Sequence, residues 1–324
     1  MSELHKFLFD GLPVRGAIVR LTDAWQEILK RRAANNETGA YPLPVTALLG
    51  EMSAAAVLMQ ANIKFNGALV LQVFGDGPVK LAVVEVQPDF GVRATATLQG
   101  GIAADASLSH MVNQNNEGRC AITLDPLDRL PGQQPYQGVV PLFDDHGKRL
   151  QQFSQVLEHY MLQSEQLDTT LVLAANDTTA AGLLIQRLPV MGEGNLSARA
   201  TAADEDQIGK NEDYNRISIL AASLQADELL SLDADTILRR LFWEEKLVRF
   251  EPLAPKFACS CSRERVSQMI RSLGVEETES ILAERGDVEV GCDFCGQQYR
   301  FDPIDAAGIF TGAEKQAPGS SSLQ

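Results

Sequence analysis

The sequence predicts an α+β protein with three parts: an N-terminal mixed domain with antiparallel sheets, a helical linker, and a small cysteine-rich C-terminal domain. Three observations support this organisation. β-type runs outnumber helical runs up to about Pro189 and meet mostly through short turns. The composition changes at Met191, and four of the five cysteines crowd into the C-terminal part of the chain, from Cys259 onward. A chain of 324 residues is long enough for two domains and a sizeable core.

The first elements follow from hydrophobic periodicity and capping residues. Lys6–Phe9 and Val14–Leu21 are typical of strands, and Thr22–Arg32 of a helix that Thr22 or Asp23 caps. A long helix is expected over Pro44–Lys64. The turn sequence Gly75-Asp76-Gly77-Pro78 between two β-type runs indicates a hairpin. The two strands of the hairpin are expected at Phe65–Phe74 and Val79–Val86. A helix is expected at Lys148–Gln166, and further strands at Val92–Leu98, Arg119–Leu124, Tyr136–Leu142, Thr169–Ala175 and Gly182–Leu188.

One apolar stretch, Val45–Ile63, is about as long as a membrane span. Glu51, Gln60 and Asn62 interrupt it, and an Ala/Leu/Met pattern fills the rest, which favours a core helix of a soluble protein. No Arg/Lys-led apolar segment with a small-residue cleavage site stands at the N-terminus. We therefore expect a cytoplasmic protein that does not enter a membrane and whose cysteines are thiols.

The middle of the chain is expected to be a flexible and helical linker. Gly192–Asn215 is rich in small and charged residues, as solvated linkers are. Arg216–Leu232 has the apolar spacing of an amphipathic helix, a second helix is expected from Asp235 as N-cap to Phe242, and Lys246–Phe250 should be extended. This segment has little mass of its own, so its apolar face must lie on something else.

The C-terminal part contains short elements with clear boundaries. Ser262 should cap a helix that ends at Gly274, and a second helix should close at Gly286. Strands at Val288–Val290 and Tyr299–Phe301 flank a turn, and Pro303 opens a last helix after Asp302. The expected domains are residues 1–190, the linker 191–256, the cysteine-rich domain 257–311 and a disordered tail 312–324.

Two close thiol pairs are the strongest chemical signal. A long insertion separates the pair in Cys259-Ser260-Cys261 from the pair in Cys292-Asp293-Phe294-Cys295. Brought together across a folded insertion, the four thiolates can occupy the corners of a tetrahedral structural zinc site. One Zn²⁺ held by Cys259, Cys261, Cys292 and Cys295 is therefore expected, which makes the last domain zinc-binding. The C-x-C half is unusual for a zinc ribbon, which mostly uses C-x-x-C twice.

Energetics suggest what such a site would do. A unit of this size has a thin core, while a structural zinc contributes an apparent free energy of roughly 10 to 16 kcal/mol, so metal binding and folding should be one event. Disulfides within each pair would close loops of only three or four residues, worth roughly 2 kcal/mol each, and would not tie the two halves together. Oxidation would then unfold the domain, loosen the amphipathic segment and expose apolar faces. The same cluster could equally be an inert structural clip.

The cysteine motifs closely resemble those of the redox-regulated 33-kDa heat shock protein family of bacteria, a family of holdase chaperones. The C-terminal resemblance rests on Phe257-Ala258-Cys259-Ser260-Cys261-Ser262-Arg263-Glu264-Arg265, Cys292-Asp293-Phe294-Cys295-Gly296 and Tyr299. The rest of the chain adds Val14-Arg15-Gly16, Gly75-Asp76-Gly77-Pro78, Tyr136-Gln137-Gly138-Val139-Val140, Gln163-Ser164-Glu165-Gln166, Glu244-Glu245 and Phe250-Glu251-Pro252.

The resemblance implies an inactive reduced form with zinc on the four cysteines. Peroxide or hypochlorite, together with unfolding stress, would give Cys259–Cys261 and Cys292–Cys295 disulfides, zinc loss, linker unfolding and dimerisation. The activated homodimer would capture unfolding client proteins without ATP. Two departures from the family pattern are the long Gly192–Asn215 stretch and Asp168, which stands where the family tends to have Pro. Cys120, in an apolar strand run, is expected to be a buried inert thiol.

Other functional classes have weaker support. A zinc deaminase needs H-x-E, and none of the four histidines has a Glu two residues on; no G-x-S-x-G elbow or P-loop is present, so no catalytic residues are expected. A thiol-disulfide oxidoreductase using Cys292 and Cys295 stays a minor alternative. The other alternative is a zinc-ribbon module that binds a partner. Nucleic acid is disfavoured, because the net charge is −15 and 23 acidic residues face 14 basic ones from Asn195 onward.

Overall fold

The structure, a computed structural model, describes residues 1–35, 38–128, 132–188, 209 and 211–311. The chain forms two compact units, Met1–Ala258 and the part that follows from Cys259. The expected flexible stretch lies outside the described residues at 192–208 and 210, as does the expected tail at 312–324.

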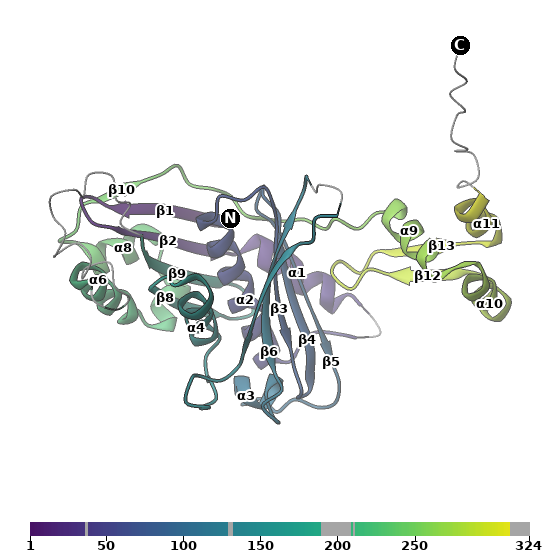
Figure 1. The fold of residues 1–324 in the computed structure, drawn as a ribbon, viewed down its shortest axis with the longest axis horizontal. Coiled ribbons are helices and arrows are strands. Elements are labelled where there is room, and N and C mark those ends of the chain that lie inside the picture. The colour runs from purple at the N-terminus through teal and green to yellow at the C-terminus, as the bar shows by residue number, and fades with distance from the viewer. Residues whose placement is uncertain (36–37, 129–131, 189–208, 210, 312–324) are drawn as a thin grey trace, which may run out of the picture. The chain divides into compact units, whose positions relative to one another are not determined.

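The first unit contains two sheets (Figure 1). The five-stranded sheet has the order β10-β1-β2-β9-β8 and is antiparallel throughout. Its strands are β1 (Glu3–Phe9), β2 (Val14–Leu21), β8 (Thr169–Ala175), β9 (Ala180–Arg187) and β10 (Leu247–Arg249). The predicted antiparallel α+β fold is therefore confirmed, and the extended segment expected near Lys246–Phe250 is an edge strand paired with β1.

The six-stranded sheet has the order β11-β5-β4-β3-β6-β7. Its strands are β3 (Gly67–Phe74), β4 (Val79–Val86), β5 (Gly91–Leu98), β6 (Arg119–Pro126), β7 (Tyr136–Pro141) and β11 (Lys256–Phe257). β3 and β4 form the predicted hairpin, with Phe74 opposite Leu81. The short strand β11 is parallel to β5, an addition from distant sequence that no local pattern indicated.

The helix α2 (Leu43–Asn62) packs against strands of both sheets and forms the centre of the main core. It is the one helix among the described residues that is long and apolar enough to cross a membrane, and 78% of its most apolar window is buried inside this unit. Its close approach to β8 requires a glycine, since a Cβ at Gly50 would lie 2.3 Å from the Cβ of Ala175. The predicted core helix is confirmed.

Three further helices complete this part: α1 (Asp23–Ala33), α3 (Leu108–Val112) and α4 (Phe153–Glu165). α3 was not predicted, because five residues are too few for a helical period to be recognised. The helix expected from Lys148 begins only at Phe153, since Gln152 and Gln155 form a capping box there. The start at Lys148 was therefore wrong by about one turn.

Helices α6 (Glu212–Ala222), α7 (Ala226–Ser231) and α8 (Ala234–Phe242) cover the face of the five-stranded sheet opposite to α2. Alternate strand residues separate the two faces: Phe7, Phe9 and Ile18 pack with these helices, whereas Ala17 and Val19 belong to the α2 core. The first unit is therefore layered as helices, sheet, α2 and second sheet (Figure 1). The apolar face of the linker helices packs on the five-stranded sheet, which confirms the prediction that it needs another surface to cover it.

Three sequence-based boundaries in this helical layer were wrong. The single helix expected over Arg216–Leu232 is broken at Ser223–Gln225, where the Ser223 hydroxyl donates to the Leu220 carbonyl and Gln225 caps α7. The solvated stretch expected up to Asn215 already turns helical at Glu212, because the Asn211 side chain accepts the Tyr214 N–H at 2.7 Å. The N-cap of α8 is Asp233, not Asp235.

Asp168 forms a buried ion pair with Arg187. Its carboxylate accepts a hydrogen bond from Arg187 Nε at 2.7 Å, and the two side chains are 9% and 4% exposed. It also accepts the Gly209 N–H at 3.2 Å. A proline at this position could not balance the charge of Arg187, so the acidic residue has a clear role in this chain.

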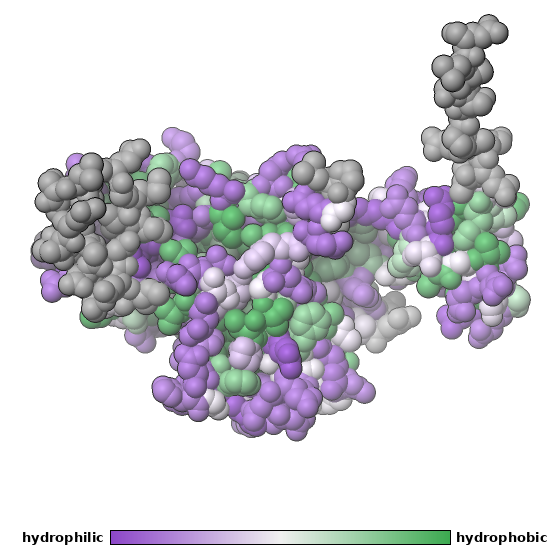
Figure 2. Space-filling view, in the orientation of Figure 1, coloured by the Kyte–Doolittle hydropathy of each residue, from purple (hydrophilic) through white to green (hydrophobic). Residues whose placement is uncertain are grey.

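The second unit contains α9 (Arg263–Leu273), α10 (Val275–Arg285), β12 (Val288–Gly291), β13 (Gln298–Phe301) and α11 (Pro303–Thr311). The predicted caps are confirmed: the Ser262 hydroxyl accepts the Arg265 N–H, and Gly286 ends α10 with φ of 83°. Five hydrophobic residues form its buried cluster: Val266, Ile270, Val288, Phe301 and Ile309. Figure 2 shows apolar side chains at its surface over α11, where Ile304 is 82% exposed.

Candidate metal centre

Two chain segments of the second unit bring the four cysteines together. Cys259 and Cys261 directly precede α9, whose start is fixed by the Ser262 cap, and Cys292 and Cys295 occupy the turn between β12 and β13. The four Sγ atoms lie within 4.8 Å of one another. The structure thus places all four sequence-predicted ligands in one cluster, which could hold a metal ion.

The sulfur spacings fit a metal better than a disulfide. Cys259 Sγ is 3.7 Å from Cys292 Sγ, and Cys261 Sγ is 3.3 Å from Cys295 Sγ. Sulfurs that bind one zinc at about 2.3 Å in a tetrahedron lie about 3.8 Å apart, whereas bonded sulfurs are about 2.05 Å apart. These two contacts join sulfurs from different pairs, so the cluster holds the two chain segments together.

The turn between β12 and β13 directs backbone N–H groups at two of the sulfurs. The Gly296 N–H donates to the Cys292 carbonyl at 2.8 Å, and Gly296 takes the left-handed conformation with φ of 72°, which suits glycine. Cys292 Sγ accepts the N–H groups of Phe294 and Cys295, and Cys295 Sγ accepts that of Gln297. Such donors favour thiolates, the form that binds metals.

Burial and the closeness of the other thiols have the opposite effect, because they raise the pKa values of Cys292 and Cys295. Hydrogen bonding to Cys259 and burial hold the pKa of Cys292 far above its usual range, and burial raises the pKa of Cys295 to about 11. Four thiolates this close need a cation to balance their charge, and soft sulfur donors select metals such as zinc. The donor set and its N–H groups therefore fit a Cys₄ zinc site.

Tyr299 contacts the cluster, and Arg263 contacts β13 and α11, in ways that the sequence did not indicate. The Tyr299 hydroxyl donates to Cys261 Sγ at 3.2 Å, and this bond raises the pKa of Tyr299 to about 12. The Arg263 guanidinium lies 4.2 Å from the ring centroid of Phe301 and donates to Asp305 at 2.7 Å. Tyr299–Phe301 was expected only as a strand, and no sequence signal specifies the sulfur contact.

Cys120 lies apart from this cluster, in β6 of the first unit. Its side chain is fully buried in the main core, and burial raises the pKa of its thiol to about 12. The thiol therefore stays protonated at neutral pH, and its predicted burial is confirmed.

Comparisons with known proteins agree with the fold and with the cysteine motifs. Residues 2–302 match the family model described as "Hsp33 protein". The "33 kDa chaperonin" of Chromobacterium violaceum is 46% identical over 309 residues, covering 95% of this chain and 94% of that protein, and the one of Methylobacillus flagellatus is 42% identical over 320 residues, covering 98% and 97%. The crystal structure of the Thermotoga maritima 33 kDa chaperonin (HSP33) has a TM-score of 0.72 at 20% identity, covers 96% of this chain and 98% of its own, and so shares the fold. The chain therefore belongs to the Hsp33 family.

Proposed function

We propose that this protein is a redox-regulated, ATP-independent holdase chaperone that protects unfolding and oxidatively damaged proteins from aggregation. The observation that carries the proposal is the four-thiol cluster, Cys259, Cys261, Cys292 and Cys295, in a unit with a small hydrophobic core. The names of the relatives, 33 kDa chaperonins, agree with chaperone action. Reduced cysteines holding one zinc ion define the resting form.

The resting form depends on the metal because the hydrophobic cluster of the second unit, over its described residues 259–311, has five buried members. Each such side chain stabilises a fold by roughly 1.5 to 3 kcal/mol before the entropy of ordering the chain is counted. A structural zinc supplies an apparent free energy of roughly 10 to 16 kcal/mol. When bound, it balances the charge of four thiolates and links the segment before α9 to the turn between β12 and β13.

Oxidation removes the ligands. Forming the Cys259–Cys261 and Cys292–Cys295 disulfides converts four zinc-bound thiolates into two S–S bonds and releases Zn²⁺. The four electrons, together with four protons from the solvent, reduce two molecules of peroxide to four of water. Within-pair bonds close loops of three or four residues, worth roughly 2 kcal/mol each. Neither bond joins the two segments, so the unit unfolds.

Unfolding then reaches the helical layer of the first unit through the chain itself. Only Ala258 separates β11 from Cys259, and the segment Leu247–Ala258 is held by edge-strand pairings with β1 and β5. Loss of α6, α7 and α8 would uncover one face of the five-stranded sheet, including Phe7, Phe9 and Leu183. An apolar face of this kind suits unfolding client proteins and a second copy of the chain.

The remaining assignments belong to the same proposal. We expect a cytoplasmic homodimer on activation, no enzymatic activity, and no binding to nucleic acid or membranes; the net charge of −15 supports the exclusion of nucleic acid. The same charge favours solubility when apolar surface is exposed. The proposed domain boundaries are residues 1–190, 191–256, 257–311 and 312–324.

Light scattering of a thermally unfolding client tests the proposal. The zinc-loaded reduced protein should not suppress aggregation, whereas protein oxidised under mild heat should do so near stoichiometrically and without ATP. Equal protection by both forms would reject the switch, and protection by neither would reject the chaperone. Retained zinc after oxidation, or Cys259–Cys292 linkage in peptide mapping, would reject the release mechanism. Multiple turnovers of a substrate disulfide would instead indicate a thiol-disulfide oxidoreductase. Binding of a partner by the reduced form alone would indicate a zinc-ribbon module.

A further inference from the structure

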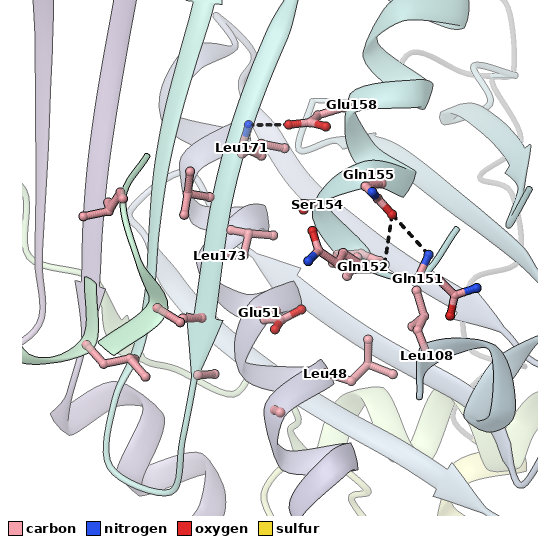
Figure 3. Close-up of a pocket in the computed structure, with 18 of the residues that line it drawn as sticks. Leu48, Glu51, Leu108, Gln151, Gln152, Ser154, Gln155, Glu158, Leu171 and Leu173 are labelled. Carbon is pink, nitrogen blue, oxygen red and sulfur yellow. Dashed lines mark hydrogen bonds between the residues drawn. The ribbon is translucent and has the colours of Figure 1, made fainter. Parts of the chain in front are cut away.

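A cavity of about 720 Å³ lies in the first unit, away from the cysteines. It is formed by α2, α3, the start of α4, strand β8 and the turn between α6 and α7 (Figure 3). Its volume lies within the roughly 300 to 1,000 Å³ that is typical of pockets for small molecules, and its exposed lining is more polar than apolar. Leucines from three of these elements supply apolar walls here: Leu48, Leu108, Leu171 and Leu173.

Glu51 projects from α2 into this cavity (Figure 3). Burial is the sole cause that raises the pKa of its carboxyl, to about 7. Among the described residues, none donates a hydrogen bond to this carboxyl or forms an ion pair with it. The side chain is half-buried, and a carboxyl that faces a cavity and has a raised pKa commonly indicates a binding site.

The rest of the polar lining is acidic or neutral. Glu158 of α4 faces the cavity and accepts the Leu171 N–H at 2.8 Å, and burial also raises its pKa. Gln151, Gln152 and Gln225 add amide groups. Glu51 and Glu158 are the titratable residues that line the cavity within the part of the chain that the structure describes, and no Lys, Arg or His is among them. The described lining therefore offers no positive charge to Glu51, and a cationic ligand would supply one.

We propose that this cavity binds a small organic cation, an ammonium or guanidinium group carried on an apolar body. The cationic group pairs with the Glu51 carboxylate, and the apolar body contacts Leu48, Leu171 and Leu173. The wall formed by Leu224, Gln225 and Leu230 belongs to the helical layer over the five-stranded sheet. A bound ligand would therefore stabilise this helical layer against the loss that the proposed function requires. That consequence rests on the proposed function, whereas ligand binding itself does not.

Three probes with one apolar body and different head groups test the site: 4-phenylbutylamine, 4-phenylbutanol and 4-phenylbutyrate. Binding to the full-length, reduced, zinc-loaded protein is measured by isothermal titration calorimetry at pH 8. We expect the amine to bind tightest and the carboxylate not at all. Glu51→Gln should weaken amine binding about tenfold and leave alcohol binding unchanged. Glu244→Gln, at an exposed position outside the cavity, should change neither.

A second measurement keeps the proposal testable should Glu51→Gln fail to fold. Amine binding needs an ionised Glu51, so its affinity for the unmodified protein should rise from pH 6 to pH 8, while that of the alcohol stays constant. Equal binding of amine and alcohol, binding of no probe, or an amine affinity independent of pH would each overturn the site. None of these measurements involves a client, so failure of the chaperone proposal would leave them unaffected.

Discussion

The two units differ in what holds them together. Among the described residues, the first unit buries one cluster of 44 residues around α2 and another of 17 beneath α6, α7 and α8, whereas the cluster of the second contains five. A large apolar core makes a fold insensitive to the loss of any one ligand. A thin core makes a fold depend on its metal, and that metal depends on thiols that an oxidant can remove. In the proposed function, the oxidant therefore acts on the unit with the smaller core.

The largest expected effect comes from removing one metal ligand. Cys292→Ser should abolish tight zinc binding and unfold the second unit, because the metal's apparent contribution of roughly 10 to 16 kcal/mol is lost there, while the first unit stays folded. Hydrogen exchange followed by mass spectrometry checks this: protection of β12 and β13 should vanish, and that of β2 and β9 should persist.

Cys120→Ala is the matched control, because this cysteine lies in the large core. It should keep zinc and retain protection in both units. If Cys292→Ser kept β12 and β13 protected, the second unit would not depend on its metal, and the comparison between the units would fail.

A smaller effect is expected from the helical layer. Phe242 of α8 packs edge-on against Phe9, with ring centroids 5.1 Å apart, and is 2% exposed. Phe242→Ala should destabilise this layer by about 3 to 5 kcal/mol and raise the reduced protein's protection of a client. Thermal unfolding and light scattering measure the two effects.

The adjacent Trp243, which is 75% exposed, provides the control. Trp243→Ala should change stability by no more than about 0.5 kcal/mol and leave the reduced protein inactive. Client protection that rises equally in both variants would mean that this layer does not cover the binding surface.

A pH-dependent effect is expected from Glu51. Burial raises the pKa of its carboxyl from 4.5 to about 7 in the folded protein, so the folded state binds this proton more tightly than the unfolded state. Its contribution therefore becomes unfavourable as pH rises from 4.5 to 7 and stays so above pH 7. Glu51→Gln should stabilise the first unit by up to about 3 kcal/mol above pH 7 and have little effect near pH 4.

Urea unfolding of both proteins at pH 4 and pH 8 measures this difference, with Glu244→Gln as the exposed control. If Glu51→Gln raised the free energy of unfolding equally at both pH values, ionisation of Glu51 would not be the cause. The effect concerns the first unit alone, since the cavity lies within it.

The smallest expected effect is at the hydroxyl that contacts the cluster. Tyr299→Phe removes the hydrogen bond to Cys261 Sγ but keeps the ring. Zinc retention against a competing chelator should fall about tenfold, with the second unit still folded. Unchanged retention would mean that the four thiols and the turn's N–H groups hold the metal without help from Tyr299.

Much of this molecule could be predicted from sequence, because its signals are local. The hairpin around Gly75-Asp76-Gly77-Pro78, the apolar helix near Leu43–Asn62 and the caps at Ser262 and Gly286 each depend on neighbouring residues. The cysteine spacing likewise indicated which four side chains meet. When two close cysteine pairs flank a folded insertion, few other ways of grouping the four thiols are available.

Tertiary structure decided what depends on distant partners. The pairing of β10 with β1 and of β11 with β5 joins residues far apart in the chain, and no periodicity encodes the partner of an edge strand. The packing of α6, α7 and α8 on one face of the five-stranded sheet joins residues that are far apart in the chain. The buried Asp168–Arg187 pair, the Tyr299 contact with Cys261 and the cavity at Glu51 were likewise decided by packing. By itself the sequence determined most of the helices and strands and the four cysteines that cluster, because spacing along the chain is a local property. Burial, charge pairing and cavities exist only once the layers have assembled.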